Sequence, residues 1–343
     1  MSSTAPSNAE TAFIRTAAAQ GLRLDGRAPT AFRPLKFHFA STPGAVEVHL
    51  GAADAAAGNS TKVQAVVSAE LGRPAILAPN EGVLAIALEL APDFSAAQAS
   101  VHRNEEEASV SRLLERALRR SGAVDLESLS VIAGEVAWHV RIDIRVLDAG
   151  GNILDAACVA ALAALLHFRR PDVGVEHTPS TDFLPSAGAA ADAATAALAA
   201  SGGPSVRVYG PDERPPVPLT MHHLPVCVTF AFFNDGHDVV LDPTRGEEIA
   251  ASPATPDSMA FVLNANGELC ALRKDGGCAM DLKRVLQCGR LAALKAADLT
   301  KAIKDAVARC EQAMLSATKA RAAAKGTNDA SVVAVENPVV LEE

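Results

Sequence analysis

The chain has 343 residues and a formal net charge of −9, so a broadly basic surface for nucleic acids is excluded and only a local patch could contact them. Hydrophobic residues make up 49% of the chain but aromatic residues only 4%, which favours helices packed through small side chains. Six cysteines are scattered without a CxxC pair, so we expect no metal site, no cofactor and a reducing intracellular compartment. The longest apolar stretch, 154–168, is shorter than the roughly 20 residues of a membrane span, and the N-terminus lacks the pattern of a signal peptide.

The first 90 residues predict a short helix followed by strands. The helix is expected at 11–20, and Asp25-Gly26 marks a turn after it. Val46, Val48 and Leu50 alternate with polar residues, as in a strand with one buried face. A Gly/Ala-rich stretch at 51–59 interrupts the pattern and predicts a surface insertion. Further strands are expected at 61–71 and 82–90.

Residues 104–121 predict an amphipathic helix. Asn104 suits the N-cap position and Gly122 suits the end of the helix. One helical face is apolar and carries Val110, Leu113, Leu114, Ala117 and Leu118. Beside it, helical spacing places four arginines in a stripe: Arg112, Arg116, Arg119 and Arg120. From the residues alone this stripe is either a solvated face, with Glu115 paired to Arg119, or a cationic patch with a ligand.

The rest of the chain predicts a second set of strands and helices. A strand at 138–146 and a Gly-rich turn at 148–151 lead into an Ala-rich helix at 153–167. A low-complexity insert at 176–204 separates this part from strands at 206–209, 226–233, 238–241, 259–263 and 269–273. The last two strands are joined through the hairpin signal Asn266-Gly267. A long amphipathic helix at about 281–317 and a frayed tail from Ala322 complete the chain.

These elements predict an α+β protein with two pseudo-repeated sheet-plus-helix halves. We expect the first half at 1–175, the low-complexity insert at 176–204, the second half at 205–320 and a flexible tail at 321–343.

Several blocks of the sequence resemble the RNase PH family. The motif Arg23-Leu-Asp-Gly-Arg27 is typical of the whole superfamily, and further family-like blocks lie at 111–121, 125–129, 133–135 and 155–157. The runs at 167–172 and 217–233, with Asp242-Pro243, resemble one branch, the exosome ring subunits of the polymyositis/scleroderma autoantigen type. That branch is related to the larger-type subunit of the archaeal exosome ring.

The resemblance implies an RNase PH-type fold and a function in an assembly. It implies a six-membered ring of RNase PH-like subunits with cap subunits around a channel for single-stranded RNA, acting in 3′-to-5′ RNA processing, including rRNA processing, and in RNA degradation. It also implies a location in the nucleus, including the nucleolus, and in the cytoplasm. In the larger-type subunits the helix equivalent to 104–121 borders the channel, so the resemblance favours RNA contact by Arg112 and Arg116, and less strongly by Arg119 and Arg120.

The resemblance also allows the chemistry to be tested position by position. In active family members the turn equivalent to Gly150-Gly151 continues with a hydroxyl residue and an arginine that hold the attacking phosphate. Here Asn152 and Ile153 follow, and Ile153 supplies neither charge nor donor. We therefore expect a subunit without catalytic residues, and the alternative is an active phosphate-dependent 3′ exoribonuclease. An unrelated α+β scaffold without RNA is a third possibility.

Two groups of residues are candidates for the missing chemistry. Asp242, Glu247 and Glu248 could supply one carboxylate, and the second family aspartate falls near Ala254 or Thr255, with Asp257 close by. Asp242-Pro243 is also a common turn at the end of a strand. The pair His222-His223 could be a metal ligand or a base, but adjacent residues in an extended segment face opposite sides, which favours a structural or interface position.

Overall fold

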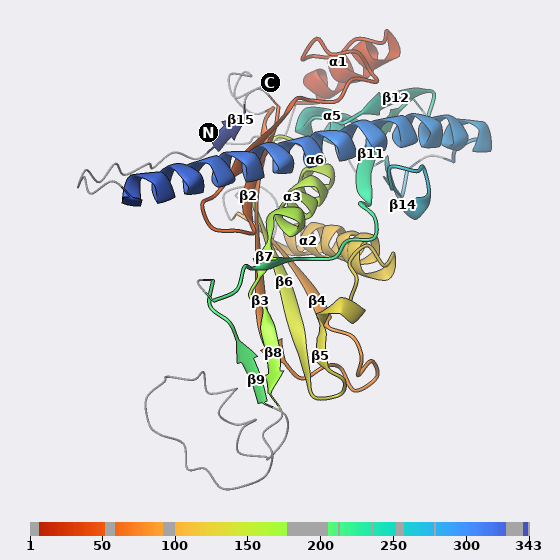
Figure 1. Cartoon of the computed structure of the whole chain (residues 1–343). Coiled ribbons are helices and arrows are strands. Elements are labelled where there is room, and N and C mark those ends of the chain that lie inside the picture. The colour runs from red at the N-terminus through yellow and green to blue at the C-terminus, as the bar shows by residue number, and fades with distance from the viewer. Residues whose placement is uncertain are drawn as a thin grey trace, which may run out of the picture.

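The computed structural model describes residues 7–51, 59–91, 100–176, 205–211, 213–234, 236–251, 257–277, 279–326 and 339–341. Two antiparallel-rich sheets and the helices around them form an α+β fold, as predicted from the sequence (Figure 1). The predicted inserts at 51–59 and 176–204 fall almost wholly outside the described residues.

The larger sheet has seven strands in the order β15-β1-β2-β3-β6-β4, with β5 paired to β6. Its strands are β1 (Leu35–Phe39), β2 (Ala45–Leu50), β3 (Thr61–Gly72), β4 (Val83–Leu90), β5 (Ser130–Ile132), β6 (Val136–Ala149) and β15 (Val339–Leu341). Only β4 and β6 run parallel; the other pairs are antiparallel. In β2 the burial alternates with Val46, Val48 and Leu50 inside, which confirms the period of two.

The smaller sheet has four strands in the order β12-β11-β13-β14. They are β11 (Val226–Phe233), β12 (Asp238–Leu241), β13 (Ser258–Leu263) and β14 (Leu269–Asp275), and Gly267 has the positive φ of +81° in the turn between the last two. Every residue of β11 is buried, because it is a central strand covered on both faces.

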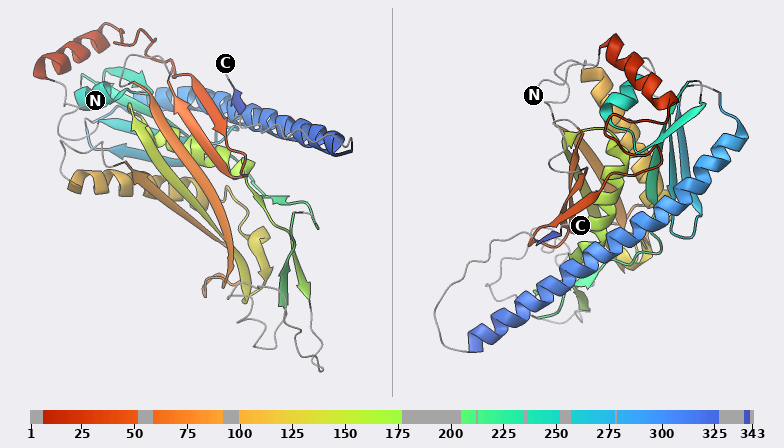
Figure 2. Two further views of the ribbon diagram at one scale, coloured as in Figure 1. Left: turned by 90° about the vertical axis from the view of Figure 1, so that its left-hand side faces the viewer. Right: turned by 90° about the horizontal axis from the view of Figure 1, so that it is seen from above.

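Helix α3 (Ile153–His167) lies between the two sheets (Figure 2). It contacts β2 and β3 of the larger sheet and β11 of the smaller one, and all its residues except Leu166 are buried. Its alanines let the backbone approach both sheets, and it joins the halves into one core. The sequence prediction of this helix is confirmed at both ends.

Two further helical layers cover the smaller sheet. Helix α6 (Leu282–Gly326) contacts β11 and β13, while α1 (Asn8–Ala19) and α5 (Arg245–Ala251) pack at the β11–β12 edge. Two short two-stranded sheets pair β7 (Arg169–Arg170) with β10 (Val217–Pro218), and β8 (Val173–Glu176) with β9 (Ser205–Val208).

Several boundaries differ from the sequence prediction, most clearly those of α2 and α6. Helix α2 spans Ser100–Glu115, so Asn104 lies inside it and is not the N-cap. Its continuation, Arg116–Arg120, is a π-helical turn, and Gly122 follows with φ +70°. Helix α6 runs to Gly326, beyond the predicted end near 317, so the first residues of the predicted tail are helical and its residues 339–341 form β15.

Candidate functional site

The Gly-rich turn after β6 meets the loop after β12, and the resemblance places the phosphate site of active family members at this junction. The Arg245 N–H donates to the Gly150 carbonyl at 2.9 Å. Gly151 has φ +102°, and a Cβ there would lie 2.3 Å from the backbone nitrogen of Arg245. The turn at Gly150-Gly151 and the segment that follows β12 are far apart in the sequence, but their backbones are in direct contact.

We expect Gly151→Ala to lower the free energy of unfolding by about 3 kcal/mol, because it adds a backbone clash to an unfavourable φ. Gly134 is the matched control, since its φ is +78° but a Cβ there would meet nothing within 4 Å. Gly134→Ala should cost about 1 kcal/mol, the penalty of the left-handed conformation alone. Urea unfolding of both variants measures the difference, and equal losses would contradict the close approach at Gly151.

Asp242 is fully buried and its carboxylate receives hydrogen bonds from three residues. Arg33 donates from its backbone N–H at 2.9 Å, from Nε at 2.9 Å and from Nη2 at 2.8 Å. Arg27 Nη1 donates at 2.9 Å and Asn152 Nδ2 at 2.7 Å. Burial acts to raise the pKa of Asp242, but the bonds and charge of Arg33, with Asn152 and Arg27, lower it below its ordinary value. Asp242 is thus an ionised internal anion, enclosed by donors.

Asn152 links this carboxylate to a second buried one. Its Nδ2 also donates to Asp155 Oδ2 at 2.8 Å, and its backbone N–H donates to Glu248 Oε1 at 2.7 Å. Asn152 has φ +52°, and its Oδ1 has no hydrogen-bond partner among the described residues. Asp155 accepts from the N–H and the hydroxyl of Thr229 at 2.9 and 2.7 Å. The helix start that would face a phosphate is occupied by the chain's own carboxylates.

The pKa of Asp155 is raised to about 6, because burial disfavours its charged form more than Thr229 and Asn152 favour it. In the unfolded chain the value is about 3.9, so folding binds a proton between these two values. The contribution of this carboxyl to stability is fully present below about pH 4 and is lost as the pH rises through about 6.

We therefore expect the stability of the wild type, relative to Asp155→Asn, to fall by about 2 kcal/mol between pH 4 and pH 7. The measurement is guanidinium unfolding of both chains across that range. The variant controls for every other titrating group, because only the carboxyl at 155 is changed. A difference that does not vary with pH would show that Asp155 titrates normally.

The three N-terminal arginines of this cluster were not predicted as site residues. Arg23 is buried and donates from Nε and Nη2 to Glu247 at 2.9 and 2.6 Å, and from Nη1 to the Leu241 carbonyl at 2.9 Å. Arg33 Nη2 also donates to the Gly151 carbonyl at 3.0 Å. The motif Arg23-Leu-Asp-Gly-Arg27 therefore clamps the loop after β12, and its cations are committed to internal partners. The signal in the sequence was three arginines within a short non-helical segment.

The remaining predicted carboxylates do not gather on an open surface. Glu247 pairs with Arg23 at 2.6 Å, and desolvation raises the pKa of the half-buried Glu248, with Arg245 opposing. Asp257 lies 3.4 Å from the Lys274 ammonium. The positions Ala254 and Thr255 lie outside the described residues.

The two adjacent histidines have separate partners. His222 Nε2 lies 3.9 Å from Asp125, while His223 Nε2 lies 3.7 Å from the Cys270 sulfur. Within the described parts of the chain, no group of three or more His, Cys, Asp or Glu side chains is arranged to hold a metal ion. The same residues contain no helix that is long and apolar enough to cross a membrane.

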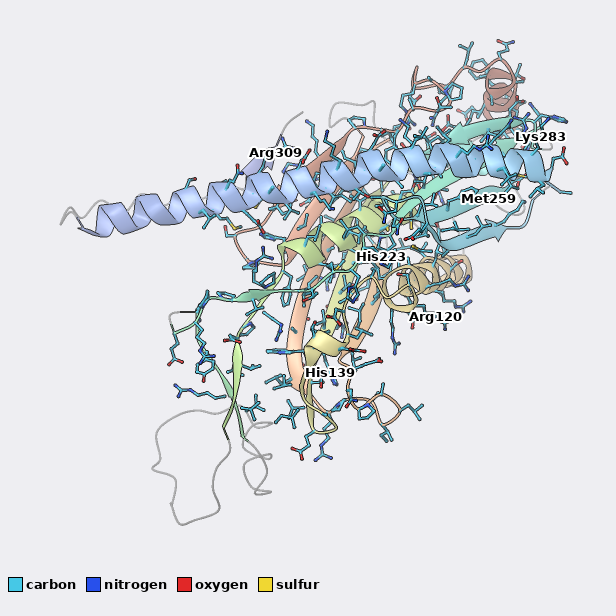
Figure 3. The ribbon with its side chains drawn as sticks, turned by 45° about the vertical axis from the view of Figure 1, so that its right-hand side comes forward. Arg120, His139, His223, Met259, Lys283 and Arg309 are labelled. Carbon is cyan, nitrogen blue, oxygen red and sulfur yellow. The ribbon has the colours of Figure 1, made fainter. Side chains whose placement is uncertain are left out.

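The arginine stripe lies on the exposed side of α2 and of the π-helical turn. Arg112, Arg116, Arg119 and Arg120 are all exposed, while the predicted apolar face is buried against the sheet that contains β4. Arg119 Nη1 lies 3.3 Å from Glu115, a pair that is about half exposed on both sides and that the solvated-face interpretation anticipated. Arg120 is at the end of the turn (Figure 3). The stripe is a separate surface from the buried cluster.

Comparisons with known proteins agree with this fold. The family model described as 3′ exoribonuclease family, domain 1, matches residues 31–171, and the model for domain 2 of the same family matches residues 223–293. Among solved structures, an archaeal exosome core subunit superimposes with a TM-score of 0.64 at 24% identity, covering 87% of this chain and 97% of that one. That similarity supports the fold.

Similarity to curated proteins extends over most of the chain. Exosome complex component RRP45A of Arabidopsis thaliana is 39% identical over 298 residues, which are 87% of this chain and 86% of the relative. Exosome complex component RRP45 of Danio rerio is 35% identical over 307 residues, 90% of this chain and 68% of the relative. The protein of the same name in Schizosaccharomyces pombe is 36% identical over 280 residues, 82% and 83% of the two chains. The chain belongs to the RNase PH family, in the branch of the RRP45-type exosome components.

Proposed function

We propose that this chain is a non-catalytic structural subunit of an exosome ring that guides RNA during 3′-to-5′ processing and degradation. Its relatives carry the name exosome complex component, which supports the assembly. One observation carries the catalytic half of the proposal: beside the turn at which active family members hold phosphate, the donors of Arg27, Arg33 and Asn152 converge on the chain's own carboxylate at Asp242.

The charges around this position oppose an attacking phosphate. Asp242, Asp155 and Glu247 are buried beside the turn and Glu248 is half-buried there, and the nearby guanidiniums of Arg23, Arg27, Arg33 and Arg245 pair with carboxylates. Phosphorolysis needs a cation and free N–H donors at the reacting phosphate. The N–H of Asn152 is bonded to Glu248, and Ile153 has no polar side chain, so neither supplies such a contact.

The proposed partners are those of a ring subunit. They are other RNase PH-like exosome ring subunits, cap subunits and single-stranded RNA, in the nucleus, including the nucleolus, and in the cytoplasm. Arg112 and Arg116 are proposed to contact the RNA backbone, with lesser contributions from Arg119 and Arg120. The exposure of all four side chains on one surface supports this assignment.

We expect no phosphate-dependent release of nucleoside diphosphates from single-stranded RNA, either by the purified chain or through this subunit within a ring. The assay compares RNA with and without inorganic phosphate and repeats the ring measurement with Asp242→Asn in this subunit. Phosphate-dependent turnover by the purified chain would establish the alternative, an active phosphorolytic exoribonuclease.

Assembly tests the other half of the proposal independently. Co-expression with an RNase PH-like subunit of the smaller type should give a tight heterodimer on gel filtration. A stable monomer that ignores every ring subunit would contradict the structural function even if the chain proved inactive.

A further inference from the structure

The outer strand of the larger sheet is completed by the C-terminal segment of the chain. β15 pairs antiparallel with β1, with Phe37 opposite Leu341, His38 opposite Val340 and Phe39 opposite Val339. The other edge of β1 is already paired with β2, so β15 occupies the edge that would otherwise present unpaired N–H and C=O groups. Pro338 directly precedes the strand, where the lack of an N–H donor is tolerated. Figure 1 shows β15 beside this edge, near α6.

A groove continues from this edge toward α6. It has a volume of about 300 Å³ and is open on one side. Its apolar walls come from the segment around β1 and from the facing side of the helix: Phe32, Leu35, Phe37, Leu299 and Ala302. These side chains are buried or half-buried in the described part of the chain, so the groove is a shaped recess between two elements.

The rim of the groove is mainly cationic. Lys295 and Arg309 lie on α6, with Arg309 labelled in Figure 3. Lys295 is 3.8 Å from Asp298, and Arg309 makes one hydrogen bond, from Nε to the Asp305 carbonyl of its own helix at 3.3 Å. Among residues whose side chains are described, no carboxylate lies within ion-pair distance of Arg309. A ligand that places an apolar side chain in the groove and an anionic group at its rim would therefore be favoured.

The sequence after β15 has this chemistry. Leu341 is followed by Glu342 and Glu343. In the register of the β1–β15 pair, each further residue moves one position back along β1, so Glu342 would pass Lys36 and Glu343 would pass Leu35. Leu35 lines the groove, so in this register Glu343 shares the groove face and is led toward its cationic rim, while Glu342 shares the opposite face with Lys36.

We propose that the β1 edge and this groove form one strand-addition site for an extended apolar segment followed by carboxylates, and that residues 339–343 of the chain itself are its occupant. Backbone pairing along Phe37–Phe39 supplies the affinity, and the groove with Lys295 and Arg309 supplies the selectivity for acidic residues. The tail is thereby held on the body of the protein, and it covers an edge that would otherwise be open to another strand.

Amide hydrogen exchange of the full-length chain tests this proposal at Phe37 and Phe39. The Ala40 N–H donates to the Ala45 carbonyl and the Gly51 N–H to the Pro34 carbonyl, so the even-numbered residues of β1 bond β2, whereas Phe37 and Phe39 face β15. Leu341→Pro should raise the exchange of these two amides about ten-fold or more, because it removes the N–H that faces Phe37 and the tail can no longer complete the ladder. Val333→Pro is the matched control in the same tail, and it should leave the exchange unchanged. Equal exchange in the wild type and Leu341→Pro would overturn the proposal.

A synthetic peptide with the sequence of residues 337–343 tests the charge and the occupant separately. Added to the Leu341→Pro chain, it should restore protection of the same amides in a concentration-dependent way. The peptide with both glutamates changed to lysine should bind about two- to five-fold more weakly at low salt. In the full chain, Glu342→Lys with Glu343→Lys should raise exchange, whereas Glu336→Lys should not. Failure of the native-sequence peptide to protect, or equal binding of both peptides, would overturn the assignment of this occupant.

Discussion

Asp242→Ala is expected to lower the free energy of unfolding by about 3–5 kcal/mol, because it leaves buried guanidiniums without their anion. Arg33 is 5% exposed and makes a two-point pair with Asp242, and Arg27 adds a third charged contact at 2.9 Å. The measurement is equilibrium unfolding in guanidinium at pH 7, where Asp242 is ionised in the wild type.

Asp143→Ala is the matched control, because Asp143 makes an equally short pair with Arg141 at 2.7 Å on the surface. Both side chains of that pair are more than a third exposed, so the loss should be below about 1 kcal/mol. The double variant Asp242→Leu with Arg33→Met should recover part of the stability, since it removes the buried charge from both partners. A loss at Asp242 no larger than at Asp143 would contradict its structural function.

Reversing the charge at Arg112 and Arg116 together (Arg112→Glu with Arg116→Glu) is expected to weaken RNA binding by a reconstituted ring about ten- to hundred-fold at low salt. Contacts with phosphates depend on charge and carry no sequence information, so the loss should be similar for different RNA sequences. For two contacts with a single strand, the slope of log K against log salt should become shallower by about 1.4. Binding titrations across a salt series measure both quantities.

Arg141 and Arg145 provide the matched control for this experiment. Both are exposed arginines on β6, paired with Asp143 and Glu89, and their reversal makes the same change in net charge on another surface. Charge reversal at Arg141 and Arg145 should leave the slope of log K against log salt unchanged. Ring assembly by each variant is checked by gel filtration. An unchanged affinity and slope for the Arg112/Arg116 variant would mean that the stripe is only a solvated helix face.

Elements whose burial is periodic or complete were predicted most accurately from the sequence. Helix α3 and strands β11 and β12 begin and end at the predicted residues, because turn residues bound their apolar runs on both sides. The start of α2 was wrong, since residues 100–104 are mostly polar and show no helical periodicity. In α1 the capping box of Ser7 and Glu10 places the start at Asn8, a signal that was present in the sequence but not used.

The sequence predicted several residues of the candidate site but not the contacts between them. The change at Asn152 and Ile153 was evident from the sequence, and Asp242 was singled out. Its pairing with Arg33 spans 209 residues and depends on how the two sheets pack, which no local pattern encodes. The sequence did not predict that the carboxylates of this site would be neutralised by arginines of the chain's own N-terminal segment: Arg23 pairs with Glu247, and Arg27 and Arg33 pair with Asp242.

The order of strands in the larger sheet also affects how quickly the protein can form. β3 pairs with β6, which is synthesised only after β4 and α2, and the clamp between Arg33 and Asp242 joins segments from opposite ends of the core. Most of the stabilising contacts are therefore non-local, and chains of this kind fold on the order of milliseconds to seconds or more slowly. During synthesis the apolar faces of β1–β3 leave the ribosome before their partners exist, and the buried pair of Arg23 with Glu247 closes only when Glu247 has emerged. The newly made chain thus has an extended period in which a neighbouring subunit or a chaperone would find its apolar surfaces uncovered.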